Sequence, residues 1–277
     1  MRLFVDPQSK AATQAAQWRA SRPADAAAMD QIGSQPIASW MTSSTPDVRA
    51  SVAAIVTRAQ AQGAVPVFAT YNIPQRDCGS AGGTADSYRS WIRAFASGLS
   101  GSSVVILEPD AIAQADCLSP AARSTRYGLM ADAVQVLKAA NAIVYLDGGN
   151  ARWLAPEDMG QRLTQSGIAQ ADGFAVNVAH YLDNATNIAY GEAVSRATGG
   201  KHFVIDTGRN GRGGSGTEWC NVPGQALGVN PSVNTGHPLV DAFLWVKQPG
   251  ESDGTCNGGP PPGNWWPEYA LGLVQRR

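Results

Sequence analysis

The sequence predicts an α/β fold, with a (β/α) barrel of parallel strands as the favoured architecture and an open, doubly wound sheet as the alternative. Short apolar runs alternate with helical patterns seven or eight times along 277 residues, and no linker or internal repeat divides the chain. This alternation is typical of a parallel sheet whose connections are helices. The length fits one large domain with a full core.

The expected strands are short apolar runs bounded by residues that interrupt regular structure. They are Leu3–Val5, Pro36–Trp40, Val65–Tyr71, Val104–Leu107, Ala142–Leu146, Gly173–Val178, His202–Ile205 and Val240–Val246. The expected helices are Ala11–Arg19, Val48–Gln62, Ser87–Leu99, Thr125–Ala140, Pro156–Gln165 and Gly191–Thr198. Arg22-Pro23 is expected to end the first of these helices.

The helix expected over Val48–Gln62 has the clearest boundaries. Asp47 precedes it as an N-cap, and Gly63 follows it as a stop. Its apolar side chains recur on one face, which is the periodicity of an amphipathic helix. They are Val52, Ile55, Val56 and Ala59.

The run Val104–Leu107 is the most apolar of the strands, and it leads directly into Glu108-Pro109-Asp110. A short run that is apolar on both faces is typical of a buried parallel strand. It places two carboxylates, fixed by a proline, at its C-terminal end. A scaffold has no need for an acid at that point, whereas an acid–base site does.

Polar residues follow directly after the other expected strands as well. In a barrel, the carboxyl ends of the strands meet at one rim, where enzymes with this fold place their catalytic groups. The segment Gly208–Pro267 is rich in Gly, Pro, Asn and Trp, and such long loops usually cover a functional face. The residues expected on the rim are Tyr71, Glu108, Asp110, Asp147, Asn177, Asp206 and Lys247.

Composition argues against several classes of function. The formal net charge of −1 gives no electrostatic basis for binding nucleic acid or an anionic membrane, and no apolar run reaches the ~18–20 residues of a membrane span. Three dispersed histidines and the lack of a CxxC pair argue against a zinc site. Gly211–Gly216 matches GxGxxG, but Glu218–Pro223 follows it in place of a helix, so no dinucleotide cofactor is expected.

The four cysteines bear on the compartment. Met1-Arg2 leads into LFVDP without the apolar core of a signal peptide, so the chain is either cytosolic or a secreted protein whose signal was removed. Disulfides favour secretion. Of the three possible pairings we favour Cys78–Cys117 with Cys220–Cys256, since each joins two loops from the same end of the fold. Four unpaired thiols are the alternative.

Carboxylates and aromatic rings dominate the expected rim and its loops. They are Asp77, Asp110, Asp147 and Asp253, with Trp40, Trp153 and Trp219. A flat aromatic face suits the apolar face of a pyranose, and the polar groups suit its hydroxyls. For any one of these tryptophans, core packing is the alternative. The combination predicts a site for a carbohydrate.

Glycoside hydrolysis requires two carboxyl groups in different protonation states. Asp110 follows the most apolar strand, where neighbouring acids would raise its pKa, so it is the expected acid. Asp253 lies in a loop near Lys247, which would favour its ionised form. Inverting enzymes hold the two carboxyls roughly 6.5–9.5 Å apart and retaining enzymes roughly 5–5.5 Å apart, and a retaining enzyme is the alternative.

Five motifs resemble, in order along the chain, those of glycoside hydrolase family 6, the inverting β-1,4-glucanases that cut cellulose. They are Tyr71–Cys78 (YNIPQRDC), Leu107–Asp110 (LEPD), Tyr145–Gly149 (YLDGG), Glu218–Asn221 (EWCN) and Leu244–Gly254 (LWVKQPGESDG). The resemblance implies a distorted barrel of seven to eight strands with an active-site cleft at the C-terminal rim. It also implies a single catalytic domain over residues 1–277, with no metal or cofactor.

The resemblance assigns roles to individual residues. Asp110 would be the general acid, and Asp77 would raise its pKa and help to organise the water. Asp253 would be the candidate base, with a water relay through Ser80 and Asp77 as the competing idea. Tyr71 would press on the sugar ring at the cleavage point. The other residues that would bind glucose units are Trp40, Arg76, Asp147, Trp153, Asn177, Trp219, Lys247 and Glu251. The favoured disulfides, Cys78–Cys117 and Cys220–Cys256, match the two of the family.

The sequence also departs from the family pattern. Asn150 stands where relatives often have His, His180 where Asn is common, and Gly208 where Ser is usual, and the loop Gly79–Gly83 is short. The family contains tunnel-forming exo-enzymes and open-cleft endo-enzymes, and short connections leave little chain to roof a cleft. A secreted, monomeric endoglucanase acting on β-1,4-glucan chains such as cellulose and cello-oligosaccharides is therefore predicted. The alternatives are a cellobiohydrolase, a non-catalytic glucan-binding relative, and an enzyme for mixed-linkage β-glucan or xyloglucan.

Overall fold

One sheet of seven parallel strands forms the centre of the protein, in a computed structural model that describes all residues from Met1 to Arg277. Each strand pairs with the next one along the chain, so the order is β1 to β7 without a reversal. A doubly wound sheet reverses its order, and the expected barrel is therefore confirmed. The strands are β1 Ser39–Thr42, β2 Val67–Tyr71, β3 Ser103–Leu107, β4 Ala142–Asp147, β5 Gly173–Val176, β6 His202–Asp206 and β7 Val240–Leu244.

The barrel is distorted because its two edge strands meet only at a narrow seam. Ile37, just before β1, and Trp245, just after β7, form an isolated parallel bridge. Here the N–H of Ala38 donates to the carbonyl of Trp245 at 3.0 Å. Farther along the seam, the indole Nε1 of Trp40 donates to the carbonyl of Val246 at 2.7 Å.

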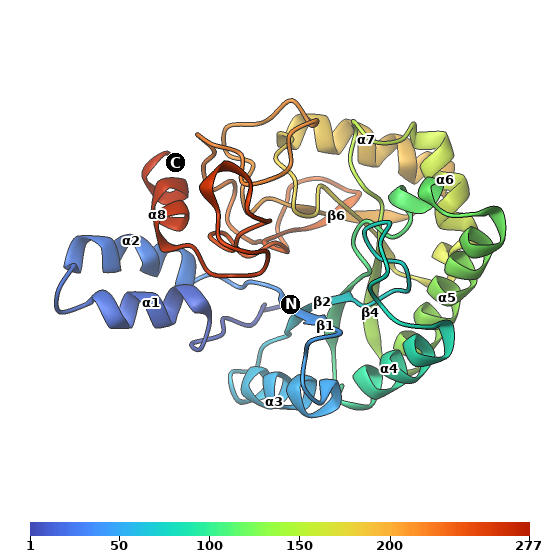
Figure 1. Cartoon of the computed structure of the whole chain (residues 1–277), viewed down its shortest axis with the longest axis horizontal. Helices are drawn as coiled ribbons and strands as arrows, with labels where there is room; N and C mark the ends of the chain where they lie inside the picture. Colours follow the sequence, from blue (N-terminus) through green and yellow to red (C-terminus); the bar gives the residue numbers. More distant parts are fainter.

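Helices cover the outside of the sheet. Figure 1 shows α3 to α7 as an arc around one side, while α1, α2 and α8 group together on the other side. The helices are α1 Lys10–Trp18, α2 Pro23–Gly33, α3 Val48–Ala61, α4 Ala85–Ser97, α5 Pro120–Ala139, α6 Pro156–Gln165, α7 Asn184–Ala197 and α8 Pro267–Gln275. Short 3₁₀ turns are η1 Ala113–Cys117, η2 Ile168–Gln170 and η3 Cys256–Gly258.

Strand β3 shows why the sheet is apolar on both faces. Val105 and Leu107 belong to the large cluster between sheet and helices, whereas Val104 and Ile106 belong to the cluster inside the barrel. Successive side chains of a strand point to opposite faces, so both sets are buried at once. The prediction of a doubly buried parallel strand is confirmed.

Several expected helix boundaries were wrong, and proline or a capping residue explains each. The expected helix Ala11–Arg19 does end before Pro23, but Pro23 then begins α2, a helix that was not predicted, because the fixed φ of proline suits a helix start. Likewise α5 begins at Pro120, with Ser119 as its cap, and not at Thr125. Helix α7 begins before the expected Gly191, because the side chain of Asp183 accepts the N–H of Thr186.

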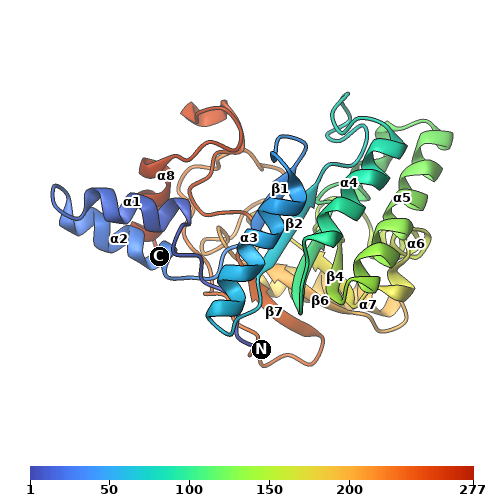
Figure 2. The ribbon, with the colours of Figure 1, turned by 90° about the horizontal axis from the view of Figure 1, so that it is seen from below.

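The two ends of the chain pack together, which the sequence pattern did not predict. Helix α8 lies beside α1 and α2 in both Figure 1 and Figure 2. Their shared core includes Met29, Ile32, Leu273 and the fully buried Trp245. The run Leu3–Val5 forms only an isolated bridge from Leu3 to Val65, and not a strand of the sheet.

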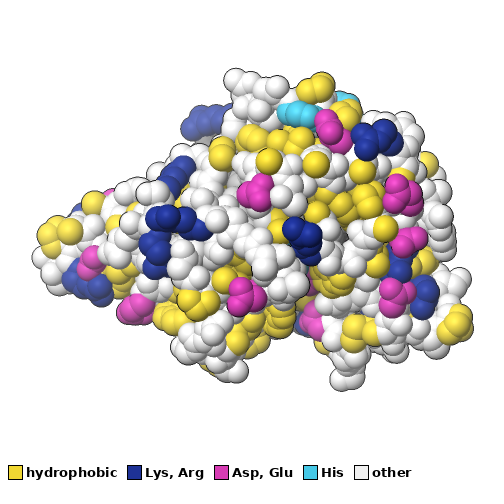
Figure 3. Space-filling model, turned by 90° about the horizontal axis from the view of Figure 1, so that it is seen from above, with side chains coloured by type: hydrophobic (Ala, Val, Ile, Leu, Met, Phe, Trp, Pro, Cys, Tyr) yellow, Lys and Arg dark blue, Asp and Glu magenta, His cyan; other side chains and the backbone are white.

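The molecular surface carries charges of both signs. On the face drawn in Figure 3, acidic and basic side chains are interspersed. No α-helix combines the length and the apolar character that crossing a membrane requires.

Candidate active site

The C-terminal ends of the strands bring the predicted rim residues to one side of the barrel. Tyr71 ends β2, Asp147 ends β4 and Asp206 ends β6. Glu108 directly follows the last residue of β3, and Asn177 directly follows the last residue of β5. Since all strands are parallel, these residues share one rim, as the sequence predicted.

Asp110 is held by its backbone, while its carboxyl group remains free. Its N–H donates to Oδ2 of Asp147 at 2.9 Å, and its φ of 70° is in the left-handed region. No hydrogen bond from the chain reaches its carboxyl oxygens. Burial raises the pKa of Asp110 well above its ordinary value, and the carboxylates of Asp147, Asp77 and Asp253 add to this.

Asp147 lies beneath Asp110 and is only 1% exposed. Its Oδ2 accepts the N–H groups of Asp110 and Gly149, at 2.9 and 3.3 Å, while its Oδ1 is buried without a partner. Burial raises the pKa of Asp147 to about 7, although the two N–H donors oppose the shift. The side chain of Asp147 therefore holds the turn of residues 108–111 after β3, called the Asp110 turn below, and it is closed off from solvent.

The raised pKa of Asp147 predicts a loss of stability with rising pH. A carboxyl group whose pKa is higher in the folded state contributes stability below its unfolded pKa and loses it as pH rises through the folded pKa. As pH rises from about 4 to about 7, each unit by which the folded-state pKa exceeds the unfolded one lowers the free energy of unfolding by about 1.4 kcal/mol. Asp147→Asn keeps an acceptor for both N–H groups but cannot ionise. Its Tm is expected to fall less between about pH 5 and about pH 8 than that of the wild type.

The matched control is Asp86→Asn, because the side chain of Asp86 is 96% exposed. Its Tm profile should follow that of the wild type. Identical pH dependence of Tm in Asp147→Asn and the wild type would contradict the ionisation assigned to Asp147.

Tyr71, Arg76 and Asp77 form a linked group at the end of β2. The hydroxyl of Tyr71 donates to Oδ1 of Asp77, and the Arg76 guanidinium lies 4.3 Å above the Tyr71 ring. Burial, with the charges of Asp110 and Asp77, raises the pKa of Tyr71, so its hydroxyl stays protonated. Trp40 packs its ring edgewise on Tyr71 at 5.3 Å.

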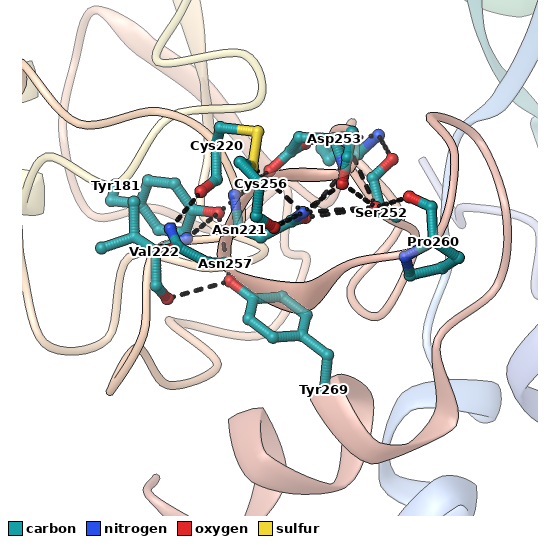
Figure 4. Close-up of a disulfide and its surroundings, with 12 residues drawn as sticks. Tyr181, Cys220, Asn221, Val222, Ser252, Asp253, Cys256, Asn257, Pro260 and Tyr269 are labelled. Carbon is teal, nitrogen blue, oxygen red and sulfur yellow. Dashed lines mark hydrogen bonds and ion pairs between the residues drawn. A yellow bond between two sulfur atoms is a disulfide. The ribbon is translucent and has the colours of Figure 1, made fainter.

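The side chain of Asp253 is only 5% exposed, and Figure 4 shows it beside Asn221. Its Oδ2 accepts hydrogen bonds from Arg209 at 2.6 Å, from the N–H of Asn221 at 2.9 Å and from the hydroxyl of Tyr181 at 3.2 Å. Lys247 approaches Oδ1 at 3.5 Å. Burial alone would raise the pKa of Asp253, but Arg209 and Lys247 outweigh it and hold that pKa below its ordinary value.

Arg209 was not among the predicted site residues. Its side chain is 0% exposed, and its guanidinium also lies 4.5 Å from the Tyr181 ring centroid. The signal available in the sequence was its place in the turn directly after β6 and Asp206, which is a rim position. Tyr181 was also missed, because nothing local in the sequence marks a residue that contacts a distant loop. Asn221 lies in the Glu218–Asn221 motif, but no role was expected for it.

A second group of charges lies around Glu251. Lys247 donates to Oε1 of Glu251 at 3.2 Å, and Lys10 from α1 donates to its Oε2 at 2.7 Å. The ammonium of Lys247 lies 5.9 Å from the Trp40 ring centroid. Trp40, Lys247 and Glu251 are therefore brought together, as expected, and Lys10 is an addition that the sequence did not indicate.

The remaining predicted residues are less closely joined. Trp153 is half-buried with its ring edge on His180, at 5.6 Å between centroids, and Trp219 is 54% exposed. Asn177 is fully buried, where it donates to the carbonyl of Asp206 at 2.8 Å. Ser80 is exposed and forms no side-chain hydrogen bond to the other site residues.

The favoured disulfide pairing is confirmed. Cys78 bonds to Cys117, which joins the Asp77 loop to η1. Cys220 bonds to Cys256, next to Asp253 in Figure 4. Both disulfides therefore tie down loops that carry the rim acids.

A parallel barrel whose rim gathers carboxylates beside aromatic rings is an architecture that glycoside hydrolases use. The chain belongs to one family of this class: the model of "Glycosyl hydrolases family 6" matches residues 1–277. The resemblance found in the motifs is thus confirmed over the whole chain.

Known relatives and structures agree with this assignment. Endoglucanase A of Cellulomonas fimi is 44% identical over 280 residues, covering 99% of this chain and 61% of that protein. Endoglucanase A of Thermobispora bispora is 41% identical, covering 98% of this chain and 61% of that protein. The chain therefore spans about three fifths of the length of these two relatives.

Among solved structures, the endoglucanase Cel6 of Mycobacterium tuberculosis superposes with a TM-score of 0.93 at 42% identity, covering 99% of this chain and 97% of that one. That structure is a complex with methyl-cellobiosyl-4-deoxy-4-thio-β-D-cellobioside.

Proposed function

We propose that residues 1–277 form the catalytic domain of an endo-acting glucanase that hydrolyses β-1,4-glucosidic bonds with inversion. The observation that carries the proposal is the contrast between the surroundings of two rim acids. The carboxyl of Asp110 accepts no hydrogen bond from the chain, whereas that of Asp253 accepts one from Arg209 at 2.6 Å and lies 3.5 Å from Lys247. Burial and neighbouring carboxylates raise the pKa of Asp110, and the two cations lower that of Asp253. One protonated and one ionised carboxyl is what glycoside hydrolysis requires. The relatives named endoglucanases support the endo mode.

Protonated Asp110 would donate its proton to the glycosidic oxygen as the bond from C1 to that oxygen breaks. Its carboxyl accepts no hydrogen bond from the chain, which leaves it free to meet a substrate. A water molecule would attack C1 from the opposite face of the ring and pass its proton to a base, so the product has the inverted configuration. The pair Tyr71 and Asp77 lies beside the acid, where it suits the ring at the cleavage point.

The contacts of Asp253 favour its ionised form, but they also reduce its strength as a base. Arg209 and Lys247 stabilise its anion, and an anion stabilised in this way is a weaker base. The water relay through Ser80 and Asp77 is the second candidate. Asp77 has the more accessible carboxyl, since its side chain is 50% exposed against 5% for Asp253.

The binding of glucan chains would rest on two sets of residues at the rim. Trp40, Lys247 and Glu251 form one set next to Tyr71 and Arg76. The half-buried Trp153 and the exposed Trp219 offer further aromatic faces. We extend the proposal to cellulose and cello-oligosaccharides as substrates, acted on by a secreted monomer whose disulfides suit an oxidising environment.

The test is hydrolysis of carboxymethyl cellulose, with viscosity and reducing ends followed together. An endo-acting enzyme cuts long chains internally, so viscosity should fall well before reducing ends accumulate. Proportional change of the two would indicate the exo-acting alternative. No hydrolysis of this polymer or of cello-oligosaccharides would indicate the glucan-binding alternative, and hydrolysis confined to mixed-linkage β-glucan or xyloglucan would change the substrate.

A further inference from the structure

Arg126, on α5, is a buried cation that forms no ion pair with a carboxylate. It is 2% exposed. Its Nη1 donates to the carbonyl of Ala111 at 3.1 Å, and its Nη2 donates to the carbonyls of Pro74 and Gln75, both at 2.8 Å. Burial lowers the pKa of Arg126, as expected for a cation removed from water. Burying a charge is costly, so these three hydrogen bonds are what holds the side chain in place.

All three carbonyls belong to the two segments that carry the proposed catalytic acids. Pro74 and Gln75 lie three and two residues before Asp77, in the loop after β2. Ala111 directly follows Asp110, in the turn after β3. A single guanidinium therefore joins the Asp77 loop to the Asp110 turn.

Both segments have backbone conformations that need external support. The φ angle is 57° at Gln75, 56° at Asp77, 49° at Glu108 and 70° at Asp110. L-residues rarely adopt this left-handed region, and they keep it only where the surroundings fix them. The contacts of Arg126 with the adjacent carbonyls supply such support.

The side chain of Glu108 binds backbone N–H groups of the Asp77 loop. Its side chain is fully buried, and its Oε2 accepts the N–H groups of Asn72 and Ile73 at 2.7 and 2.9 Å. The start of the loop is thus bound to β3 by a carboxylate, and its next two carbonyls are bound to α5 by Arg126.

We propose that Arg126 is a positioning residue that fixes the separation between the Asp77 loop and the Asp110 turn. The inference rests on the proposed function, because it concerns the same acid. Asp110 is faced by Asp147, Asp77 and Asp253, which favour its protonated form, and by Lys247, which opposes it. Coulomb interactions weaken with distance, so movement of Asp77 away from Asp110 would make the acid ionise at lower pH.

Arg126→Gln tests this without releasing the loop, since the Cys78–Cys117 disulfide still ties it to η1. We expect kcat on a soluble cello-oligosaccharide to fall by about 10- to 100-fold. The basic limb of the kcat–pH profile should move to lower pH by about half a unit or more. Arg126→Lys keeps the positive charge but loses the planar guanidinium with its several N–H donors. It should therefore recover part of the kcat and reverse part of the shift in the basic limb.

The matched control is Arg123→Gln, one turn earlier on α5. Arg123 is part of an exposed ion pair with Asp116 at 3.4 Å, so kcat and the pH limb should stay as in the wild type. An Arg126→Gln variant that loses only Tm, with kcat and the pH limb unchanged, would overturn the proposal. If Arg126→Gln fails to fold, the same comparison is made with Arg126→Lys.

A readout independent of activity separates this inference from the proposed function. In protein labelled with ¹³C at aspartate carboxyls, the Asp110 resonance is assigned by its loss in Asp110→Asn. Its titration midpoint should be lower in Arg126→Gln than in the wild type and unchanged in Arg123→Gln. Equal midpoints in all three proteins would refute the positioning role, whereas inactive wild type with a shifted midpoint would refute only the proposed function.

Discussion

Asp110→Asn is expected to lower kcat for cello-oligosaccharide hydrolysis by about 10²- to 10⁴-fold, the usual contribution of a general acid. Asparagine cannot supply the proton that the leaving oxygen requires. The N–H of residue 110 can still donate to Asp147, so the turn should keep its shape. Calorimetric titration with a cello-oligosaccharide should show binding retained within a few-fold of the wild type.

The control for this variant is Asp86→Asn, which removes an acid that is 96% exposed. It should leave kcat and Tm unchanged. An Asp110→Asn protein with more than a tenth of wild-type kcat would contradict the assignment of Asp110 as the acid. A loss of kcat accompanied by unfolding would be judged on Asp110→Glu, which keeps an acid and should keep part of the activity.

Asp253→Asn is expected to affect both stability and catalysis. Arg209 and Lys247 lose their buried anion, and breaking one partner of a buried ion pair costs about 3–5 kcal/mol. We also expect kcat to fall by about 10²-fold or more, because the site loses its ionised carboxyl. Urea unfolding and steady-state kinetics on cello-oligosaccharides measure the two effects.

A double variant separates the two effects. In Asp253→Asn/Arg209→Met the fully buried guanidinium is also removed, so part of the stability should return while kcat remains low. Recovery of kcat together with stability would show that Asp253 serves the fold alone. If azide restores turnover to Asp253→Ala but not to Ser80→Ala, Asp253 is the base; the reverse result favours the relay.

The fold could be predicted from the sequence because β2 to β7 are short, mostly apolar runs, each with a polar residue at its end or within the next three positions. Val104–Leu107 followed by Asp110 specifies both a buried parallel strand and an acid at the rim. Boundaries at Pro23 and Pro120 were less predictable, since a proline can either end a helix or begin one. Helix α8 was missed because its packing depends on α1 and α2, which lie at the other end of the chain.

The site was predictable where chemistry follows a strand end, and less so where contacts cross loops. Asp110, Tyr71 and Lys247 lie on the rim as expected. Arg209 donates to Asp253, which is 44 positions away in the sequence, and Arg126 donates to Pro74, which is 52 positions away. No local sequence pattern predicts such contacts. The burial of Asp147 likewise depends on the packing of its neighbours, and so does its raised pKa.

The most direct test of the proposed chemistry is the configuration of the first product. Proton NMR can follow a cello-oligosaccharide during hydrolysis by the wild-type protein, before the anomers of the new reducing end equilibrate. Attack by water on the face opposite the leaving group predicts that the α-anomer appears first. Initial appearance of the β-anomer would mean a retaining reaction, and it would contradict the roles assigned to Asp110 and Asp253.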